Sequence, residues 1–415
     1  MFDDSGYGPL PRRRGSGNMF THALMAILGA ALAAGLFLAF YNPASGASLP
    51  GSGVVPAPGG SAAPLTGGEQ GTVAKVKPGL VIINTTLQYN SEEAAGTGMV
   101  INADGLILTN NHVIEDSTKI TGTVVSTGKT YPATVIGYDK TGDVALIQLQ
   151  NVSGLTTVPI GNSASVKAGQ SVVALGNAEG QGAIAVTAGH VTGLNQTISA
   201  SDDGGSTSSE TLTGMIQTNA DIVPGDSGGP LATSAGVIGM DTAGNDASAD
   251  QPATGFAIPI NTALSVARQI AAGHASSTIS IGDPPFVGIF IGSGSSSSPQ
   301  AQAQQQEQQN NGYGGSGNTP ACYTSNADLT LPSTIAPVGS GTLVIGTICG
   351  SPAASAGMTG GAVITAVNGK AVGSPDDLSG ILSRFHPGDT ISVTWVSPAG
   401  QRTTSSLHLA AGPPQ

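Results

Sequence analysis

The sequence predicts a mainly β protein with more than one domain, and three observations lead to this prediction. With 415 residues, the chain is long enough for two or three domains that each bury a core. Only 9% of the residues are charged and 62 are glycine, a composition that favours strands joined by many turns. From Val73 onward, short apolar runs such as LVIINTTL and DVALIQLQ alternate with turn residues, a spacing typical of an antiparallel sandwich or barrel.

Charge and cysteine content exclude several classes of function. The net charge is -12 and the only basic cluster is Arg12 to Arg14, so we do not expect nucleic-acid binding. The two cysteines, Cys322 and Cys349, have no metal-ligand spacing. We therefore expect neither a metal nor a cofactor.

An apolar segment near the start predicts a membrane anchor. Residues 19–41 carry no charged side chain apart from His22, and at about 1.5 Å rise per residue they can form a helix that crosses a bilayer. Arg12 to Arg14 precede the segment, so the positive-inside rule leaves residues 1–18 as a cytoplasmic tail and places the rest of the chain outside. The alternative is a cleaved signal peptide with a processing site near residues 44–47, which would give a secreted protein.

Residues 42–71 predict a flexible linker, because proline, glycine, alanine and serine offer little apolar surface to offset the entropy of ordering. The apolar runs that follow delimit a domain over residues 72–274. Within it, residues 103–105 predict a hairpin turn, and residues 261–272 predict the one convincing amphipathic helix. The scarcity of helices argues against a parallel α/β sheet.

The stretch NADIVPGDSGGP, residues 219–230, contains the candidate nucleophile, Ser227. A serine hydroxyl reacts only when a base removes its proton and fixed donors stabilise the developing oxyanion. Gly225, Gly228 and Gly229 allow the backbone to turn sharply and direct N–H groups into one small space. An ordinary glycine-rich loop would look the same, so the interpretation depends on a base and a carboxylate elsewhere in the chain.

The candidate base and its orienting carboxylate lie in two earlier runs. His112 ends the run LILTNNHVI, where rigid sheet would hold it at the edge of a cleft, and His190 lies within another apolar run. Asp143 precedes a buried run, and a buried carboxylate needs a partner such as an imidazole N–H. For each residue the alternative is a structural role, as a hydrogen-bonded histidine or a turn aspartate.

Taken together, TNNHV at His112, GDVALIQL at Asp143 and QTNADIVPGDSGGP at Ser227 resemble the HtrA/Deg type of trypsin-like serine protease. The later GFAIP, residues 255–259, also fits this family. The composition rich in Gly, Pro and Ala, the single predicted anchor and the VPGD sequence are most similar to those of its actinobacterial membrane-anchored or secreted members. The resemblance implies two six-stranded antiparallel barrels of the chymotrypsin type. It also implies a small α+β PDZ domain after them, and the membrane helix would precede both.

The resemblance assigns a role to each residue of the site. Ser227 is the nucleophile, His112 the general base and then acid, and Asp143 the orienting group. The oxyanion hole would consist of backbone N–H groups of Gly225, Asp226 and Ser227. The walls of the S1 pocket, which receives the side chain before the cleaved bond, would be Asp221, Ile222, Met240, Thr242 and Ala243.

Two positions depart from the family pattern. Many HtrA members have asparagine where Asp226 stands, and its role is open between a turn residue and a donor to the hole. Asp221 stands six residues before Ser227, where trypsins carry the aspartate that selects lysine or arginine. Either Asp221 selects basic side chains, or Ile222 lines a pocket for the small aliphatic side chains that HtrA proteases prefer.

The C-terminal region, residues 284–411, resembles a PDZ domain through SPAASAGMTGGAVITAVNG, residues 351–369. Such domains add an extended peptide to a sheet edge and bind its terminal carboxylate with backbone N–H groups. The resemblance assigns the peptide groove to Phe286, Val287, Gly288, Ile289, Leu378 and Leu382. A Ser-, Gln- and Asn-rich insertion at about residues 293–319 reads as a disordered loop beside this groove. Cys322 and Cys349 would form a disulfide bond in an oxidising compartment.

These observations lead to one main functional hypothesis and one alternative. The main hypothesis is an exported, membrane-tethered serine endopeptidase that cleaves misfolded or specific envelope proteins through a Ser-His-Asp triad and an acyl-enzyme. Its partners would be unfolded or C-terminal peptide segments bound by the PDZ domain, and the resemblance also implies a homotrimer. The alternative is an exported PDZ adaptor or chaperone with a latent protease domain.

Overall fold

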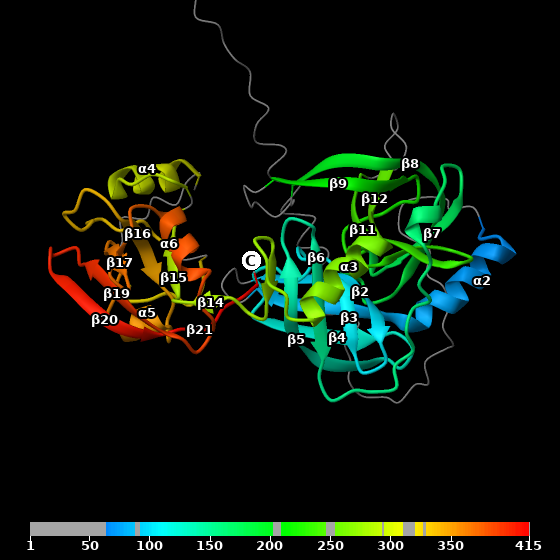
Figure 1. Cartoon of the computed structure of the whole chain (residues 1–415), viewed down its shortest axis with the longest axis horizontal. Coiled ribbons are helices and arrows are strands. Elements are labelled where there is room, and N and C mark those ends of the chain that lie inside the picture. Colours follow the sequence, from blue (N-terminus) through cyan, green and yellow to red (C-terminus); the bar gives the residue numbers. More distant parts are fainter. Residues whose placement is uncertain are drawn as a thin grey trace, which may run out of the picture. The chain divides into compact units, whose positions relative to one another are not determined.

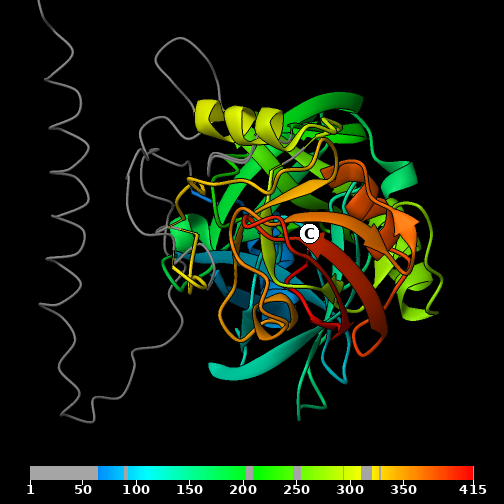
Figure 2. The same ribbon diagram turned by 90° about the vertical axis from the view of Figure 1, so that its left-hand side faces the viewer.

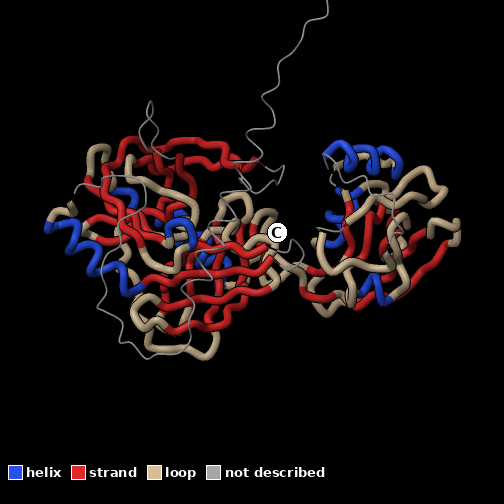
Figure 3. Tube along the Cα trace, turned by 180° about the vertical axis from the view of Figure 1, so that it is seen from behind, coloured by secondary structure: helices blue, strands red, loops and turns tan. Residues whose placement is uncertain are grey.

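The computed structural model describes residues 64–87, 92–201, 209–245, 254–292, 294–309, 320–326 and 329–414. Strands dominate this part of the chain (Figure 3), as the composition predicts. The predicted anchor, residues 19–41, lies outside these ranges. Within them, no helix combines the length and the apolar character that a membrane span requires.

The described chain opens with helix α2 (Gly67–Val76) and the 3-10 turn η1 (Lys77–Gly79). Thr66 caps α2 by accepting the Glu69 N–H, while the Glu69 carboxylate accepts the Thr66 N–H, and this reciprocal pair fixes the start of the helix. Val73 and Val76 are buried in the main core. The end of the predicted linker is therefore wrong, because residues 67–71 belong to a capped helix that packs on the domain.

The first barrel has six antiparallel strands: β1 (Leu80–Leu87), β2 (Glu92–Asn102), β3 (Leu106–Thr109), β4 (Lys119–Val124), β5 (Lys129–Asp139) and β6 (Val144–Leu149). They follow the order β5-β4-β1-β2-β3-β6, and pairing of β5 with β6 closes the sheet (Figure 1). The predicted hairpin turn joins β2 to β3, where Gly105 has φ 90° and donates to Asn102 O. Strand β13 (Ile279–Ile281) adds to β5 from beyond the predicted boundary at residue 274.

The second barrel is closed in the order β10-β11-β12-β9-β8-β7. Its strands are β7 (Ser171–Gly176), β8 (Ala185–Ser201), β9 (Ser209–Thr218), β10 (Pro230–Thr233), β11 (Gly236–Asn245) and β12 (Thr254–Pro259), with short 3-10 turns η2 (Ser163–Ser165) and η3 (Ala178–Gly180). Helix α3 (Ile260–Ala271) follows, as the sequence predicts, and buries Ile260, Ala263, Ala267 and Ile270 at helical spacing. The two six-stranded barrels that the resemblance implies are both present.

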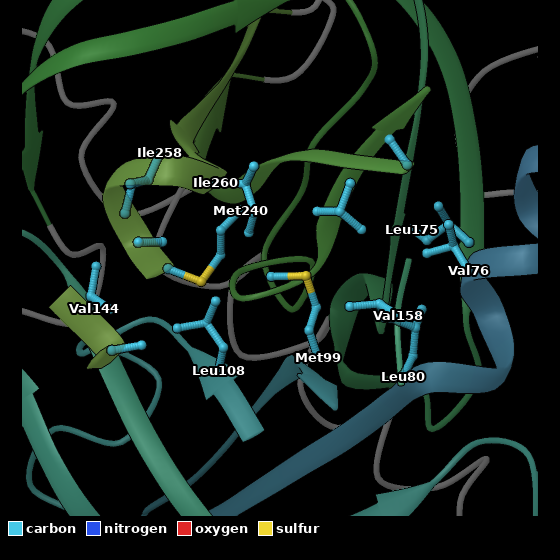
Figure 4. Close-up of a cluster of buried hydrophobic side chains, with 14 of the residues drawn as sticks. Val76, Leu80, Met99, Leu108, Val144, Val158, Leu175, Met240, Ile258 and Ile260 are labelled. Atoms are coloured by element: carbon cyan, nitrogen blue, oxygen red, sulfur yellow. The ribbon is translucent and has the colours of Figure 1, made fainter. Parts of the chain in front are cut away.

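The main hydrophobic core draws side chains from both barrels and from helices α2 and α3 (Figure 4). Leu108 and Val144 come from the first barrel, and Met240 and Ile258 from the second. Each buried aliphatic side chain contributes about 1.5–3 kcal/mol. This packing fixes the strand ends from which the candidate site residues project.

The C-terminal region forms a second, smaller β structure with short helices. Its strands are β14 (Pro285–Phe286), β15 (Ile289–Ile291), β16 (Thr342–Thr347), β17 (Val363–Val367), β18 (Lys370–Ala371), β19 (Thr390–Val396), β20 (Arg402–His408) and β21 (Ala410–Ala411). The sheet order is β15-β16-β17-β19-β20, β18 pairs with β17, and β14 pairs with β21. Helices α5 (Pro352–Ser355) and α6 (Pro375–Leu382) complete it, and Trp395 lies in its core.

Part of the predicted disordered insertion is helical. Residues Pro299–Gln309 form α4, the yellow helix of Figure 2. The buried Gln302 side chain donates to Ser296 O and Gly341 O and accepts the Leu343 N–H, so it attaches the helix to β16. The description of this stretch as a disordered loop is therefore wrong for α4, because the buried Gln302 side chain forms three hydrogen bonds inside the domain.

Cys322 and Cys349 form a disulfide bond, with Cα atoms 4.9 Å apart, as the sequence predicts. Beside it, Tyr323 forms a bridge with Ile348 and packs edge-on against Phe290 of β15. The disulfide therefore attaches the returning end of the insertion to the sheet.

Candidate active site

His112 and Asp143 come together at one end of the first barrel. His112 lies in the turn after β3, and Asp143 occupies the last position before β6, with a positive φ of 50°. Both carboxylate oxygens lie 3.0 Å from His112 Nδ1, and Oδ1 also accepts the His112 N–H at 3.1 Å. Asp143 is only 1% exposed. A carboxylate in this position favours the tautomer with a proton on Nδ1, which leaves Nε2 free to accept a proton.

Thr242 of β11 links this pair to the second barrel. Its hydroxyl donates a very short hydrogen bond to Asp143 Oδ2, and its carbonyl oxygen lies 3.5 Å from Ser227 Oγ. Thr242 was expected in the S1 wall, and its contact with Asp143 was not predicted. The two residues are 99 positions apart, so no local motif signals the contact.

The loop that carries Ser227 requires glycine at two positions. Gly225 has φ 91° and Gly228 has φ 82°, values that side chains disfavour. A Cβ atom at Gly225 would lie 2.2 Å from Asn177 O, and one at Gly228 would lie 2.1 Å from Thr97 O. The loop is further held by the Thr97 N–H, which donates to Ser227 O at 2.9 Å. Backbone from both barrels therefore fixes the candidate nucleophile.

The peptide between Pro224 and Gly225 has a defined orientation. Pro224 O accepts the N–H of Glu179 at 2.6 Å, so in a trans peptide the Gly225 N–H points to the opposite side. Across the described part of the chain, no acceptor is bonded to the N–H of Gly225 or of Ser227. These two donors remain candidates for an oxyanion hole.

Asp226 is not a third donor to this hole. Its N–H donates to Val223 O at 3.0 Å and is therefore occupied within the turn. The expectation that Asp226 contributes an N–H is wrong, because the loop folds as a tight turn around that group.

Comparisons with known proteins agree with this geometry. Residues 96–240 match the trypsin-like peptidase domain family, and residues 345–396 match the PDZ domain family. Serine protease PepD of Mycobacterium tuberculosis is 30% identical over 359 residues, which cover 83% of this chain and 66% of that protein. The chain belongs to the HtrA/Deg family of trypsin-like serine proteases.

A second HtrA/Deg relative matches the protease region alone. The periplasmic pH-dependent serine endoprotease DegQ of Escherichia coli is 39% identical over 180 residues, which cover 43% of this chain and 37% of that protein. This chain thus spans between about one third and two thirds of the length of these relatives.

The candidate S1 residues of this HtrA/Deg chain separate into different environments. Ile222 is 3% exposed, and a Cβ atom at Gly255 would lie 2.5 Å from its Cδ1 atom. Gly244 also lies against the backbone of Ile222. Thr187 donates to the carbonyl of Asp221 at 2.9 Å. The side chain of Ala243 lies outside the described part.

Met240 is not an S1 residue. It is fully buried in the main core with Leu108 and Ile260 (Figure 4). Side chains alternate along a strand, so Met240 and its neighbour Asp241 face opposite sides of β11. The expectation for Met240 is therefore wrong, because its side chain packs inside the main core.

The remaining histidine candidate, His190, is exposed on β8, and its N–H donates to Asn219 Oδ1 at 2.6 Å. Among the described residues, no cluster of three or more His, Cys, Asp or Glu side chains is arranged to hold a metal ion.

The proposed PDZ groove residues occupy two kinds of position. Strand β15, with Ile289, pairs with β16 and forms one end of the sheet order. Gly288 has φ 79°, and its carbonyl accepts from the Ile348 N–H and the Ser351 hydroxyl. Phe286 pairs with β21, whereas Val287 and Leu378 are buried in the domain core and Leu382 packs against it. The side chains of Val287 and Leu378 therefore lie in the core of this domain.

Two further carboxyl groups lie close to the Ser227 loop. Asp226 is 4% exposed, and burial raises its pKa to about 7, with a smaller contribution from the charge of Asp221. Asp241 is fully buried, and burial raises its pKa well above the usual range, with a further contribution from Asp226. The sequence gives the side chain of Asp226 no clear role, and it contains no motif that points to Asp241.

Proposed function

We propose that this HtrA/Deg chain is an exported serine endopeptidase in which Ser227, His112 and Asp143 form the catalytic triad. The observation that carries the proposal is the arrangement around Asp143. This buried carboxylate accepts from both the ring and the backbone of His112 and from Thr242, whose carbonyl lies beside Ser227 Oγ. The imidazole is thereby oriented for proton transfer at the protein surface, and its side chain is 24% exposed.

Acylation follows from these positions. His112 Nε2 takes the proton of Ser227 Oγ as that oxygen attacks the peptide carbonyl, and a tetrahedral oxyanion forms. The N–H groups of Gly225 and Ser227 stabilise the oxyanion. His112 then donates its proton to the leaving amine, the C–N bond breaks, and an acyl-enzyme remains on Ser227. Asp143 holds the imidazole and stabilises its protonated form throughout.

Deacylation repeats the same steps with water. His112 Nε2 removes a proton from the water as it attacks the ester carbonyl. The oxyanion forms again in the same hole, and collapse releases the carboxylic acid while Ser227 Oγ regains its proton. The proton is thus conserved over one cycle.

The packing of Ile222 supports a small aliphatic side chain before the cleaved bond. Ile222 is buried, with its backbone against Gly244 and its Cδ1 atom against Gly255, and we propose that it closes the pocket to a long basic side chain. A competing hypothesis gives Asp221 the role of selecting lysine or arginine. Cleavage of a peptide library distinguishes the two, because a preference for lysine or arginine that disappears in Asp221→Ala would contradict the small-pocket proposal.

Peptide binding by the PDZ domain is the second part of the proposal. An unfolded or C-terminal segment of an envelope protein would extend β15 as a new strand, and the loop at Gly288 would receive its carboxylate. The relative DegQ is described by name as periplasmic, which supports action outside the cytoplasm. Anchoring by residues 19–41 and assembly into a homotrimer complete the proposal.

The proposal is tested by degradation of an unfolded protein substrate. Wild type should cleave it, and Ser227→Ala should be inactive while retaining its thermal unfolding temperature. Ser265→Ala is the matched control, because Ser265 is exposed on α3 and the substitution makes the same chemical change. Equal activity in wild type and Ser227→Ala would contradict the triad. Peptide binding without cleavage under any condition would favour the alternative, an adaptor with a latent protease domain.

A further inference from the structure

Two buried carboxyl groups flank the backbone that forms the proposed oxyanion hole. Asp226 lies between Gly225 and Ser227, and Asp241 lies on the adjacent strand β11. Three backbone hydrogen bonds connect them: Gly228 N–H to Asp241 O, Asp241 N–H to Gly229 O, and Gly229 N–H to Asp226 O, at 2.8–2.9 Å. The position of the loop and the position of Asp241 are therefore coupled.

Hydrogen bonding leaves both carboxyl groups under-satisfied. Asp226 Oδ2 accepts the Val223 N–H at 3.1 Å, but Oδ1 has no partner within the described structure. Neither oxygen of Asp241 has a partner there either. A buried ionised carboxylate without donors is strongly unfavourable, whereas a protonated one carries its own donor.

Within the described part of the chain, no basic side chain is paired with Asp226 or Asp241. The charged groups on the packed elements are Asp221 on the preceding segment, Asp241 on β11 and the exposed Glu179 on η3, all acidic. At the end of β7, Gly176 contacts Asp226 and Asn177 is neutral; a Cβ atom at Gly176 would lie 2.4 Å from Asp226 Oδ1. None of the ion pairs in the described ranges involves Asp226 or Asp241.

We propose that Asp226 and Asp241 form a neutral acid pair that positions the oxyanion loop, and that ionisation of Asp226 switches off acylation by Ser227. This inference rests on the proposed protease function and adds a control to it. Asp226 acts as a positioning residue, since its N–H is occupied by Val223 O and its side chain packs against Gly176.

Two physical effects make ionised Asp226 unfavourable for acylation. A negative charge one residue from both hole donors opposes the negative charge that develops on the oxyanion. The ionised side chain also gains solvation if it leaves its pocket against Gly176, and that movement would turn the Gly225 N–H away from the hole. Loss of one donor to the hole typically costs about 10²–10³-fold in rate.

The burial of Asp226 places this transition in an accessible pH range. Its pKa of about 7 means that the neutral, hole-forming state dominates in mildly acidic solution and is lost as pH rises above neutrality. Burial, with a further contribution from the charge of Asp226, also raises the pKa of Asp241 well above its usual range and so favours its neutral form. The direction is opposite to that expected of the triad alone, which gains activity as the histidine base loses its proton.

The test measures the second-order rate of labelling by a fluorophosphonate probe between pH 5.5 and 8.5. Wild type should lose about tenfold or more relative to Asp226→Asn on the alkaline side, because the amide keeps the shape and cannot ionise. Asp104→Asn is the matched control, since Asp104 is exposed in a hairpin turn, and its profile should follow wild type. Superimposable profiles for wild type and Asp226→Asn would overturn the inference.

If Asp226→Asn does not fold, the inference can still be tested by a measurement on the wild-type protein. With ¹³C-labelled aspartate, one carboxyl resonance should titrate with a midpoint near neutral pH, in parallel with the loss of labelling. No titrating aspartate between pH 5.5 and 8.5 would overturn the inference. Failure of wild type to react with the probe at any pH would instead contradict the proposed function, so the two failures are distinguishable.

Discussion

Asp143 and Asp226 are two buried aspartates of one site, and they differ in how their burial is compensated. Asp143 is 1% exposed and accepts from the His112 ring, the His112 backbone and the Thr242 hydroxyl. Asp226 is 4% exposed and accepts a single backbone N–H. Asp143 and Asp226 are both buried, so burial alone does not decide the role of a carboxyl group. Surrounding donors support a carboxylate that orients a base, whereas their absence favours a neutral acid.

The largest expected effect comes from removing the charge of Asp143, the aspartate with three hydrogen-bond donors. Asp143→Asn should lower the rate of Ser227 labelling by about 10³–10⁴-fold, because an amide favours the wrong tautomer of His112. The measurement is the labelling rate at pH 6, with Asp104→Asn as the control for a neutralised aspartate. A loss below tenfold would show that Asp143 does not orient the base.

Replacing Asp226 by asparagine should stabilise the protein at neutral and alkaline pH relative to wild type. The pKa of Asp226 is raised in the folded state from 3.8 to about 7, so its stabilising neutral form is complete below pH 3.8 and is lost as pH rises through 7. The free energy of unfolding of wild type should therefore fall relative to Asp226→Asn, by on the order of 4 kcal/mol between pH 4 and 8. Urea unfolding at several pH values measures this difference.

This stability prediction has a clear contradiction. If the difference between wild type and Asp226→Asn stays constant with pH, Asp226 has the same proton affinity in the folded and unfolded chains. Asp226 would then not be a neutral acid in the folded protein, and its charge would not distinguish it from Asp143.

A smaller effect should follow from removing one donor to Asp143. Thr242→Val deletes the hydroxyl while keeping the branched shape, and should slow labelling by about tenfold, since a hydrogen bond to a charged group is worth about 1.5–3 kcal/mol. Thr242→Ser keeps the donor and should remain near wild type. Equal rates for the valine and serine variants would remove Thr242 from the account of Asp143.

The barrels, the PDZ domain and the proximity of His112 to Asp143 could be predicted because each leaves a local signal. Alternating apolar runs mark the strands, and short motifs surround His112, Asp143 and Ser227. Thr242 and Asp241 leave no such signal, because their roles depend on contacts across the barrels and on strand parity. Met240 was expected in the S1 wall but lies in the core, because core packing between the two barrels also leaves no local signal.

The insertion shows a second limit of sequence-based prediction. Its low-complexity composition indicates disorder, but Gln302 makes three hydrogen bonds to distant backbone and attaches α4 to the sheet. The pairing of Cys322 with Cys349 could be predicted because the chain has only two cysteines. The capped helix α2 was missed entirely, because the glycine-rich composition before it masked the Thr66 and Glu69 capping pair.

The central claim is that Ser227 is an activated nucleophile, and mass spectrometry after fluorophosphonate treatment tests it most directly. The account predicts one covalent adduct, located on Ser227 and absent from His112→Ala. An adduct on another serine, or an equal yield on Ser227 in wild type and His112→Ala, would contradict it.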